Sequence, residues 1–85
     1  MTIGIPKEIK IGETRVSMTP SLCRRCVSLG GKVLVQRSAG VTAGFTDGEY
    51  RAAGATLVAD AAKVWRAADL ILKVKEPLAA EYGAL

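Results

Sequence analysis

The sequence predicts an α/β fold in which a parallel sheet carries helices on both faces, built as an incomplete β-α-β-α-β-α-β unit. Strand and helix signals alternate along all 85 residues, and such alternation is typical of parallel sheets with crossover helices. Leu70, Ile71 and Leu72 are consecutive apolar residues where a half-exposed strand would alternate, so we expect the last strand to be buried on both faces. The length allows at most one small domain.

Cap residues indicate where the helices begin. Thr19 is a hydroxyl cap followed by Pro20, which suits the first helical position. Thr46 and Glu49 have the spacing of a capping box, and Asp60 can cap a third helix. The helices, with their caps, are expected over residues 19–29, 46–54 and 60–68, and a fourth begins over 79–85.

The strands lie between these helices. They are expected over residues 2–5, 32–36, 56–58 and 69–75. Pro6 and Pro77 end the first and the last of them, because proline lacks the N–H that a strand ladder needs. Right-handed crossovers between parallel strands predict a sheet of the Rossmann-like or flavodoxin-like kind.

Composition excludes several classes of function. The net charge is +4, but the basic residues are scattered and only Arg24 and Arg25 are adjacent, so we expect no nucleic-acid partner. Apolar runs are too short to span a membrane, and the first residues lack the pattern of a signal peptide. We therefore expect a cytoplasmic protein without a membrane partner.

Cys23 and Cys26 form a C-x-x-C pair, but the chain has no histidine and no further cysteine to complete a zinc site. With Leu22 and Val27 they fall on one apolar face of the first helix, which predicts packing in the core. A redox pair near the start of that helix is the alternative.

The glycine-rich stretch over 40–44 follows a strand and precedes a helix, as a dinucleotide-binding loop would. It lacks the G-x-G-x-x-G pattern, and the loop is too long, so we expect a structural loop. Without histidine, no general acid or base for neutral pH is evident. The sequence therefore predicts no catalytic, cofactor-binding or metal-binding residue in this chain.

Basic residues follow two of the expected strands, at the edge where parallel α/β sheets bind their ligands. Lys7 and Arg15 lie in the polar loop over 7–18, and Lys73 and Lys75 lie on one side of the last strand. Arginine can bind a carboxylate or phosphate at two points, and lysine supplies a point charge. We predict an anion site here, with nearby carboxylates (Glu8, Glu13 and Glu76) able to orient the basic side chains.

Five segments together resemble a known family, the N-terminal domain of L-alanine dehydrogenase. The family also contains the α subunit of the proton-translocating nicotinamide nucleotide transhydrogenase. The Lys-Val-Lys-Glu-Pro run over 73–77 resembles the alanine dehydrogenase version. The segments are MTIGIPKE (1–8), ETRVSMTP (13–20), GFTDGEY (44–50), AGA (53–55) and DLILKVKEP (69–77).

The resemblance implies a reaction, the reversible NAD-dependent oxidative deamination of L-alanine to pyruvate and ammonia. It also implies that Arg15 and Lys75 bind the substrate carboxylate and carbonyl, and it leaves Lys7, Glu13 and Lys73 as supporting residues. Family members are homo-oligomers, a property that cannot be carried over to this chain.

The family's catalytic histidine and aspartate, and its NAD-binding Rossmann domain, come later than Leu85. We therefore expect residues 1–85 to be the N-terminal part of the substrate-binding domain, inactive on its own. The alternatives are the transhydrogenase α subunit, a stand-alone binding or interaction module, and a decayed reading frame.

Overall fold

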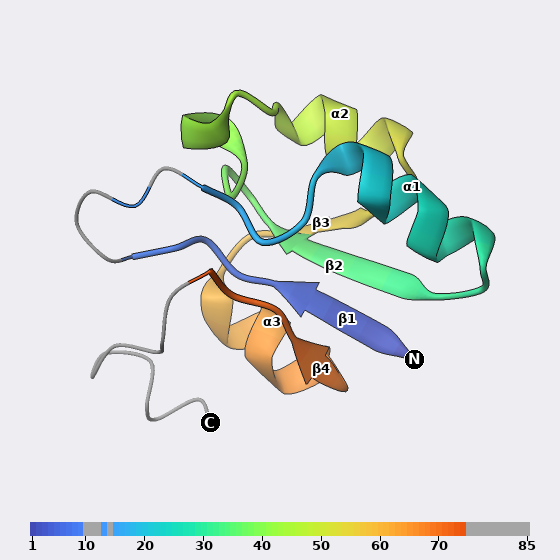
Figure 1. Cartoon of the computed structure of the whole chain (residues 1–85). Coiled ribbons are helices and arrows are strands. Elements are labelled where there is room, and N and C mark those ends of the chain that lie inside the picture. Colours follow the sequence, from blue (N-terminus) through green and yellow to red (C-terminus); the bar gives the residue numbers. More distant parts are fainter. Residues whose placement is uncertain (10–12, 14, 75–85) are drawn as a thin grey trace.

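The computed structural model describes residues 1–9, 13 and 15–74, so the predicted fourth helix, the end of the last strand and Lys75 lie outside it. The described residues form a four-stranded sheet with the order β3-β2-β1-β4, in which every pairing is parallel (Figure 1). This order matches the first strands of a Rossmann sheet rather than those of flavodoxin. The strands are β1 (Thr2–Ile5), β2 (Lys32–Gln36), β3 (Thr56–Val58) and β4 (Leu70–Ile71).

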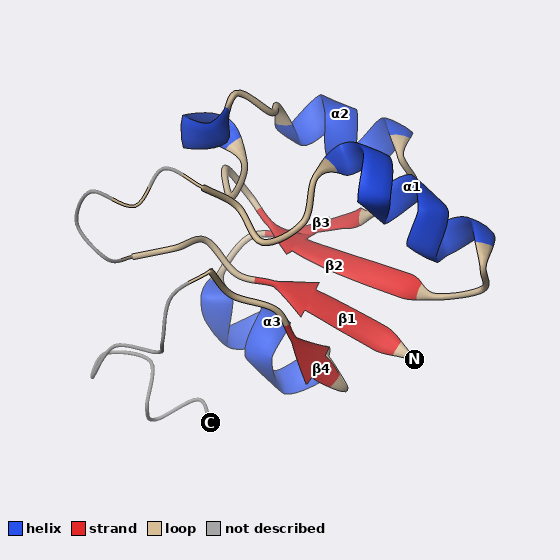
Figure 2. Cartoon of the chain, in the orientation of Figure 1, coloured by secondary structure: helices blue, strands red, loops and turns tan. Residues whose placement is uncertain are grey.

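Helices cover both faces of the sheet, as predicted. Two of them, α1 (Pro20–Ser28) and α2 (Asp47–Ala52), lie on one face, and α3 (Ala61–Ala67) lies on the other (Figure 2). The chain therefore winds outward from β1 to β3, then crosses back under the sheet to place β4 on the far side of β1. The boundary between β1 and β4 is the topological switch point, where sheets of this kind open a crevice.

The predicted caps are present. Thr19 Oγ1 accepts a hydrogen bond from the Leu22 N–H at 3.2 Å. Thr46 and Glu49 form a complete capping box at the start of α2. Asp60 Oδ1 accepts from the Lys63 N–H at 2.9 Å. The sequence signals for helix starts are confirmed because each is satisfied within three residues of its own position.

The main core lies between the sheet and the α1–α2 layer. Ile5, Val33 and Val35 point into it from β1 and β2, and the fully buried Tyr50 meets them from α2. Cys23 is also fully buried there, and burial raises the pKa of its thiol, which disfavours the reactive thiolate. The packing role predicted for Cys23 is confirmed.

Leu22 does not share the buried face predicted for it, because its side chain is 46% exposed. Cys23, Cys26 and Val27 turn towards the core, and Leu22 sits about 100° around the helix from Cys23, at the margin of the covered surface.

The prediction for the last strand was wrong in length and in burial. β4 has two residues, and Leu70 is 44% exposed. Ile71 packs under α3 near Gly4, and Leu72 packs against the main core. Leu70 points to the α1 face, but α1 packs over β2 and does not reach the outer side of β1. The three apolar residues therefore lie at an edge strand, which the described elements cover only in part.

Candidate functional site

The candidate site lies at the carboxyl ends of β1 and β4, on the two sides of the switch point. Three segments meet there: the residues after Ile5, the residues after Ile71, and the loop that leads through Arg15 to α1 (Figure 1). In open parallel sheets, this position is where ligands bind. Of the basic residues predicted for the anion site, Lys7, Arg15 and Lys73 lie in these segments.

Glu8 and Lys73 form an ion pair across the switch point. Lys73 Nζ lies 3.4 Å from Glu8 Oε1, and their side chains are only 7% and 4% exposed, respectively. Glu8 Oε2 also accepts a hydrogen bond from the backbone N–H of Val74 at 3.0 Å. Lys73 therefore neutralises a buried carboxylate of the protein rather than presenting its ammonium group to solvent.

Arg15 is held by Glu13 along one edge of its guanidinium group. Nε and Nη2 donate to the two carboxylate oxygens at 3.0 and 3.1 Å, and the Arg15 backbone N–H donates to the same carboxylate at 2.9 Å. Glu13 is 4% exposed and Arg15 65% exposed, so a buried carboxylate orients an exposed cation. The hydrogen bond and the charge of Glu13 raise the pKa of Arg15 above its ordinary value.

The other edge of the Arg15 guanidinium faces outward. Within the described part of the chain, Nη1 has no hydrogen-bond partner, and Nη2 is engaged only with Glu13. That edge keeps two parallel donors, the arrangement that binds a carboxylate at two points. Arg15 therefore has donors available for an anionic group.

Two hydrogen bonds that were not predicted from sequence fix the loop that carries Arg15. Ser17 Oγ donates to the carbonyl oxygen of Leu72 at 2.8 Å, and Tyr50 Oη donates to the carbonyl oxygen of Met18 at 2.6 Å. The partners are 55 and 32 residues apart, so no local pattern could indicate them. Together they attach this loop to the end of β4 and to α2.

The remaining predicted residues divide between inside and outside the described structure. Lys7 lies exposed after β1, and its backbone N–H donates to Gln36 Oε1 at 2.8 Å, which ties the loop to β2. Lys75 and Glu76 lie outside the described residues.

In the part of the chain that the structure describes, no three histidine, cysteine, aspartate or glutamate side chains gather as metal ligands would.

Gly40, at the start of the glycine-rich loop over 40–44, is closely packed, whereas Gly44 has open space beside it. A Cβ added to Gly40 would come within 2.6 Å of Tyr50 Cε2 and 3.1 Å of Phe45 Cβ. The glycine is therefore needed because the Tyr50 ring presses against the backbone, in a T-shaped contact with Phe45. The close contact at Gly40 gives this part of the loop a packing role.

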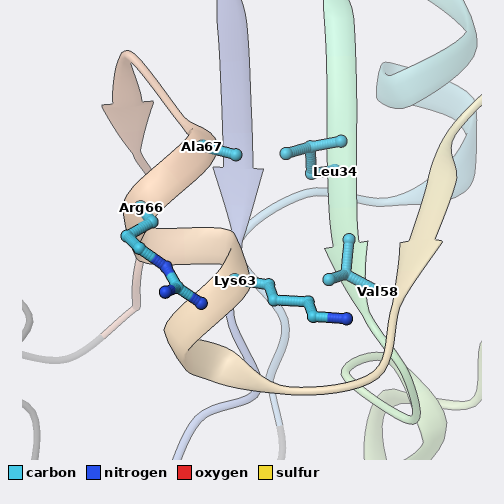
Figure 3. Close-up of a pocket in the computed structure, with 5 residues that line it drawn as sticks. All are labelled: Leu34, Val58, Lys63, Arg66 and Ala67. Carbon is cyan, nitrogen blue, oxygen red and sulfur yellow. The ribbon is translucent and has the colours of Figure 1, made fainter.

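A hollow lies on the α3 face of the sheet, away from the switch point (Figure 3). It is an open groove of about 400 Å³ with an apolar floor formed by Leu34 and Val58, and Lys63 and Arg66 extend along its rim from α3. None of the residues predicted for the anion site lines it. It marks sheet surface that α3 leaves uncovered.

None of the described helices is both long and apolar enough to cross a membrane.

Comparison with known proteins places the chain in one family. Residues 4–85 match the family model described as "Alanine dehydrogenase/PNT, N-terminal domain". The alanine dehydrogenase of Halomonas elongata is 55% identical over 85 residues, which are 100% of this chain and 23% of that protein.

Two solved structures have the same fold. An L-alanine dehydrogenase superposes with a TM-score of 0.97 at 46% identity, over 100% of this chain and 23% of that one. A transhydrogenase from Sinorhizobium meliloti gives a TM-score of 0.89 at 36% identity, over 99% of this chain and 25% of that one. This chain thus spans about a quarter of the length of the relatives that it matches. It belongs to the alanine dehydrogenase/PNT N-terminal domain family.

Proposed function

We propose that residues 1–85 form the N-terminal part of the substrate-binding domain of an NAD-dependent alanine dehydrogenase. In the proposed reaction, L-alanine is reversibly deaminated to pyruvate and ammonia. The observation that carries the proposal is the Arg15 guanidinium, held along one edge by buried Glu13 with its other edge exposed at the switch point. The family to which the chain belongs supports the choice of substrate.

In this proposal, Arg15 and Lys75 bind the carboxylate and carbonyl of the substrate. Arg15 offers a preset pair of donors, because Glu13 fixes the plane of its guanidinium group. A carboxylate held at two points fixes the direction of the α-carbon, and such orientation is a large part of what an enzyme contributes to hydride transfer. Glu13, Lys7 and Lys73 act as supporting residues.

NAD would accept the hydride from the α-carbon of alanine. The glycine-rich loop over 40–44 lacks the dinucleotide-binding pattern, and its Gly40 packs against Tyr50. We therefore propose that NAD binds to a part of the enzyme outside this chain, together with the acid–base group that the chain lacks.

The transhydrogenase α subunit is the second candidate. The solved L-alanine dehydrogenase is closer to this chain than the solved transhydrogenase, both in identity (46% against 36%) and in TM-score (0.97 against 0.89). The Lys-Val-Lys-Glu-Pro run over 73–77 also resembles the dehydrogenase version. Both observations favour alanine dehydrogenase.

A chimera tests the proposal. The matching segment of the Halomonas elongata alanine dehydrogenase is replaced by this chain, and alanine-dependent NADH formation is measured. We expect turnover within about tenfold of the parent enzyme, because the two segments share fold and 55% of their residues. Arg15→Ala should then reduce kcat/KM strongly, whereas Arg24→Ala, at an exposed arginine on α1, should not. A folded chimera without turnover would contradict the proposal.

A further inference from the structure

The carbonyl oxygen of Leu72 lies where the pairing of β1 with β4 stops. The Leu72 N–H donates to the carbonyl oxygen of Gly4 at 3.0 Å, which continues the parallel ladder one residue past β4. In such a ladder, a residue donates to one residue of the neighbouring strand and accepts from the residue two positions further along. That second residue is Pro6, which is buried and has no N–H. The backbone of β1 therefore offers no donor to the Leu72 carbonyl oxygen.

Ser17 supplies the donor from a different segment of the chain. Its Oγ donates to the Leu72 carbonyl oxygen at 2.8 Å, and both residues are partly buried. A carbonyl oxygen that loses its partner in such a place costs free energy, so the contact contributes to the fold. It also attaches the loop that carries Arg15 to the end of β4, across the switch point, only two residues after Arg15.

The residues on either side of Ser17 hold the same short segment from the other direction. Val16 packs against the main core, and Met18 is 2% exposed, with its carbonyl oxygen accepting from Tyr50 Oη at 2.6 Å. These contacts attach the segment over 16–18 to the layer that α2 forms on the sheet. The Ser17 bond adds the attachment to β4, so the segment is held on both sides of the switch point.

Arg15 directly precedes this anchored segment, and its guanidinium group is fixed to its own backbone. The Glu13 carboxylate accepts from the Arg15 backbone N–H at 2.9 Å and from Nε at 3.0 Å. The guanidinium group and the Arg15 backbone therefore move together. The place of this exposed cation at the sheet edge is then set by the segment over 16–18, to which the Ser17 bond to β4 belongs.

We propose that Ser17 is a positioning residue for Arg15. Its hydroxyl takes the place of the N–H that Pro6 lacks, and this bond fixes the Arg15 backbone relative to the end of β4. The inference rests on the proposed function, because it takes Arg15 as the residue that binds the substrate carboxylate. It goes further by naming the contact that sets where the guanidinium group lies at the switch point.

Removal of the Ser17 hydroxyl in the chimera tests the inference. We expect Ser17→Ala to raise the KM for pyruvate by about threefold to tenfold, the range for one lost hydrogen bond, and to leave the KM for NADH unchanged. Ser28→Ala is the matched control and should leave both KM values unchanged. Ser28 is exposed on α1, and its Oγ donates to the Arg25 carbonyl oxygen at 2.7 Å, so the control loses the same kind of bond away from Arg15.

Two further comparisons separate positioning from stability. Ser17→Thr and Ser17→Val introduce side chains of the same shape, and only threonine keeps a hydroxyl, so the threonine variant should have the lower KM for pyruvate. This pair also serves if Ser17→Ala does not fold. In an Arg15→Lys background, Ser17→Ala should change the KM for pyruvate by less than about twofold, because lysine makes no two-point contact that Ser17 could align.

An unchanged KM for pyruvate in Ser17→Ala, or equal values in the threonine and valine variants, would overturn the inference. So would a rise of the same size in the Arg15→Lys background, in the KM for NADH or in Ser28→Ala, because each result would assign the effect to something other than Arg15. An unmodified chimera that folds without turnover would remove the proposed function and this inference with it. An active chimera that Ser17→Ala leaves unchanged would remove only the role of Ser17.

Discussion

At the scale of single residues, the site depends on carboxylates that orient cations. Glu13 accepts a hydrogen bond from Nε of Arg15, and Glu8 forms an ion pair with the ammonium group of Lys73. Both carboxylates are buried, whereas Arg15 is mostly exposed, so Glu13 fixes the orientation of a guanidinium group that we propose to bind the substrate. A lysine at position 15 could keep the charge but not the two parallel donors.

We therefore expect Arg15→Lys in the chimera to lower kcat/KM for pyruvate by ~1.5–3 kcal/mol of transition-state stabilisation, the range for a hydrogen bond to a charged group. Arg15→Ala should lose at least as much. Steady-state kinetics with Arg24→Ala as the control measures the difference. Kinetics of Arg15→Lys equal to those of the unmodified chimera would show that the two-point geometry has no role.

Tyr50 gives a pH-dependent prediction at the same scale. Burial, with the nearby Cys23 and Glu49, raises the pKa of its phenol to about 12, from an ordinary value of 10.0. Below pH 10.0 both the folded and the unfolded state keep the proton. Between pH 10.0 and about 12 the unfolded state loses it first, so the stability of the folded state falls with rising pH and levels off above that range.

Tyr50→Phe should remove the part of this decline that Tyr50 contributes, and at neutral pH it should cost about 1–3 kcal/mol because the carbonyl oxygen of Met18 loses a buried donor. Chemical unfolding of the chimera and of its Tyr50→Phe variant across this pH range measures both effects. The same alkaline decline in the two proteins would show that another group is responsible.

The residue-scale contacts could be predicted from sequence only where they are local. Glu13 and Arg15 are two positions apart, and the sequence indicated that a carboxylate could orient the arginine. The contact of Ser17 with Leu72 joins residues 55 positions apart through the order of the strands. No propensity or spacing rule carries that information, because it depends on which strand lies beside β1.

At the scale of elements, the close packing of α3 on β1 depends on a glycine. A Cβ at Gly4 would lie 2.7 Å from Ala68 Cβ, 2.8 Å from Val64 Cγ1 and 2.9 Å from Ile71 Cδ1. Three elements therefore meet at a point where β1 has no side chain. Val64 is fully buried there, so the contact has little freedom to relax.

We expect Gly4→Ala to destabilise the fold by about 1–3 kcal/mol through overpacking. Gly48→Ala is the matched control, because its Cβ would meet only Thr46 Oγ1 at 3.7 Å and alanine favours the helix. Chemical unfolding of the two variants in the chimera measures the difference. Equal stability would mean that α3 can shift away from β1 without cost.

Helix starts were predictable at this scale, and the extent of the last strand was not. Thr19, Thr46 and Asp60 each satisfy an N–H group within one turn, so the signal and its partner are neighbours in sequence. Leu70 to Leu72 are apolar enough for a buried strand, but burial needs a covering element, and α1 lies over β2. The composition of a segment shows how apolar a strand is, but it does not show which element, if any, covers that strand.

At the scale of the whole molecule, the described structure leaves apolar surface on both faces. The α3 face has the groove floored by Leu34 and Val58, and the other face has a hollow lined by Met1, Ile3 and Leu29. Leu29 is 80% exposed and Met1 76% exposed. Since the chain spans about a quarter of its relatives' length, these faces suit contact with the remainder of such an enzyme.

The isolated 85-residue chain should show no alanine-dependent reduction of NAD, because we propose that NAD and the acid–base group belong to other parts of the enzyme. Because of its apolar surface, it should also self-associate or unfold over a broad temperature range. In the described sheet β4 is an edge strand, and this edge and the apolar hollows supply the surface for association. Activity assays and sedimentation velocity test the two expectations. Turnover by the isolated chain, or a monomer with a sharp thermal transition, would contradict this account of its surface.

The central claim is that the carboxyl edge at the switch point binds the substrate carboxylate through Arg15. A crystal structure of the chimera with pyruvate tests it most directly. We expect the pyruvate carboxylate to lie against the outer edge of the Arg15 guanidinium, with Glu13 still bonded to Nε and Lys75 also in contact with the substrate. Pyruvate bound elsewhere, with Arg15 paired to Glu13 and not in contact with it, would contradict the claim.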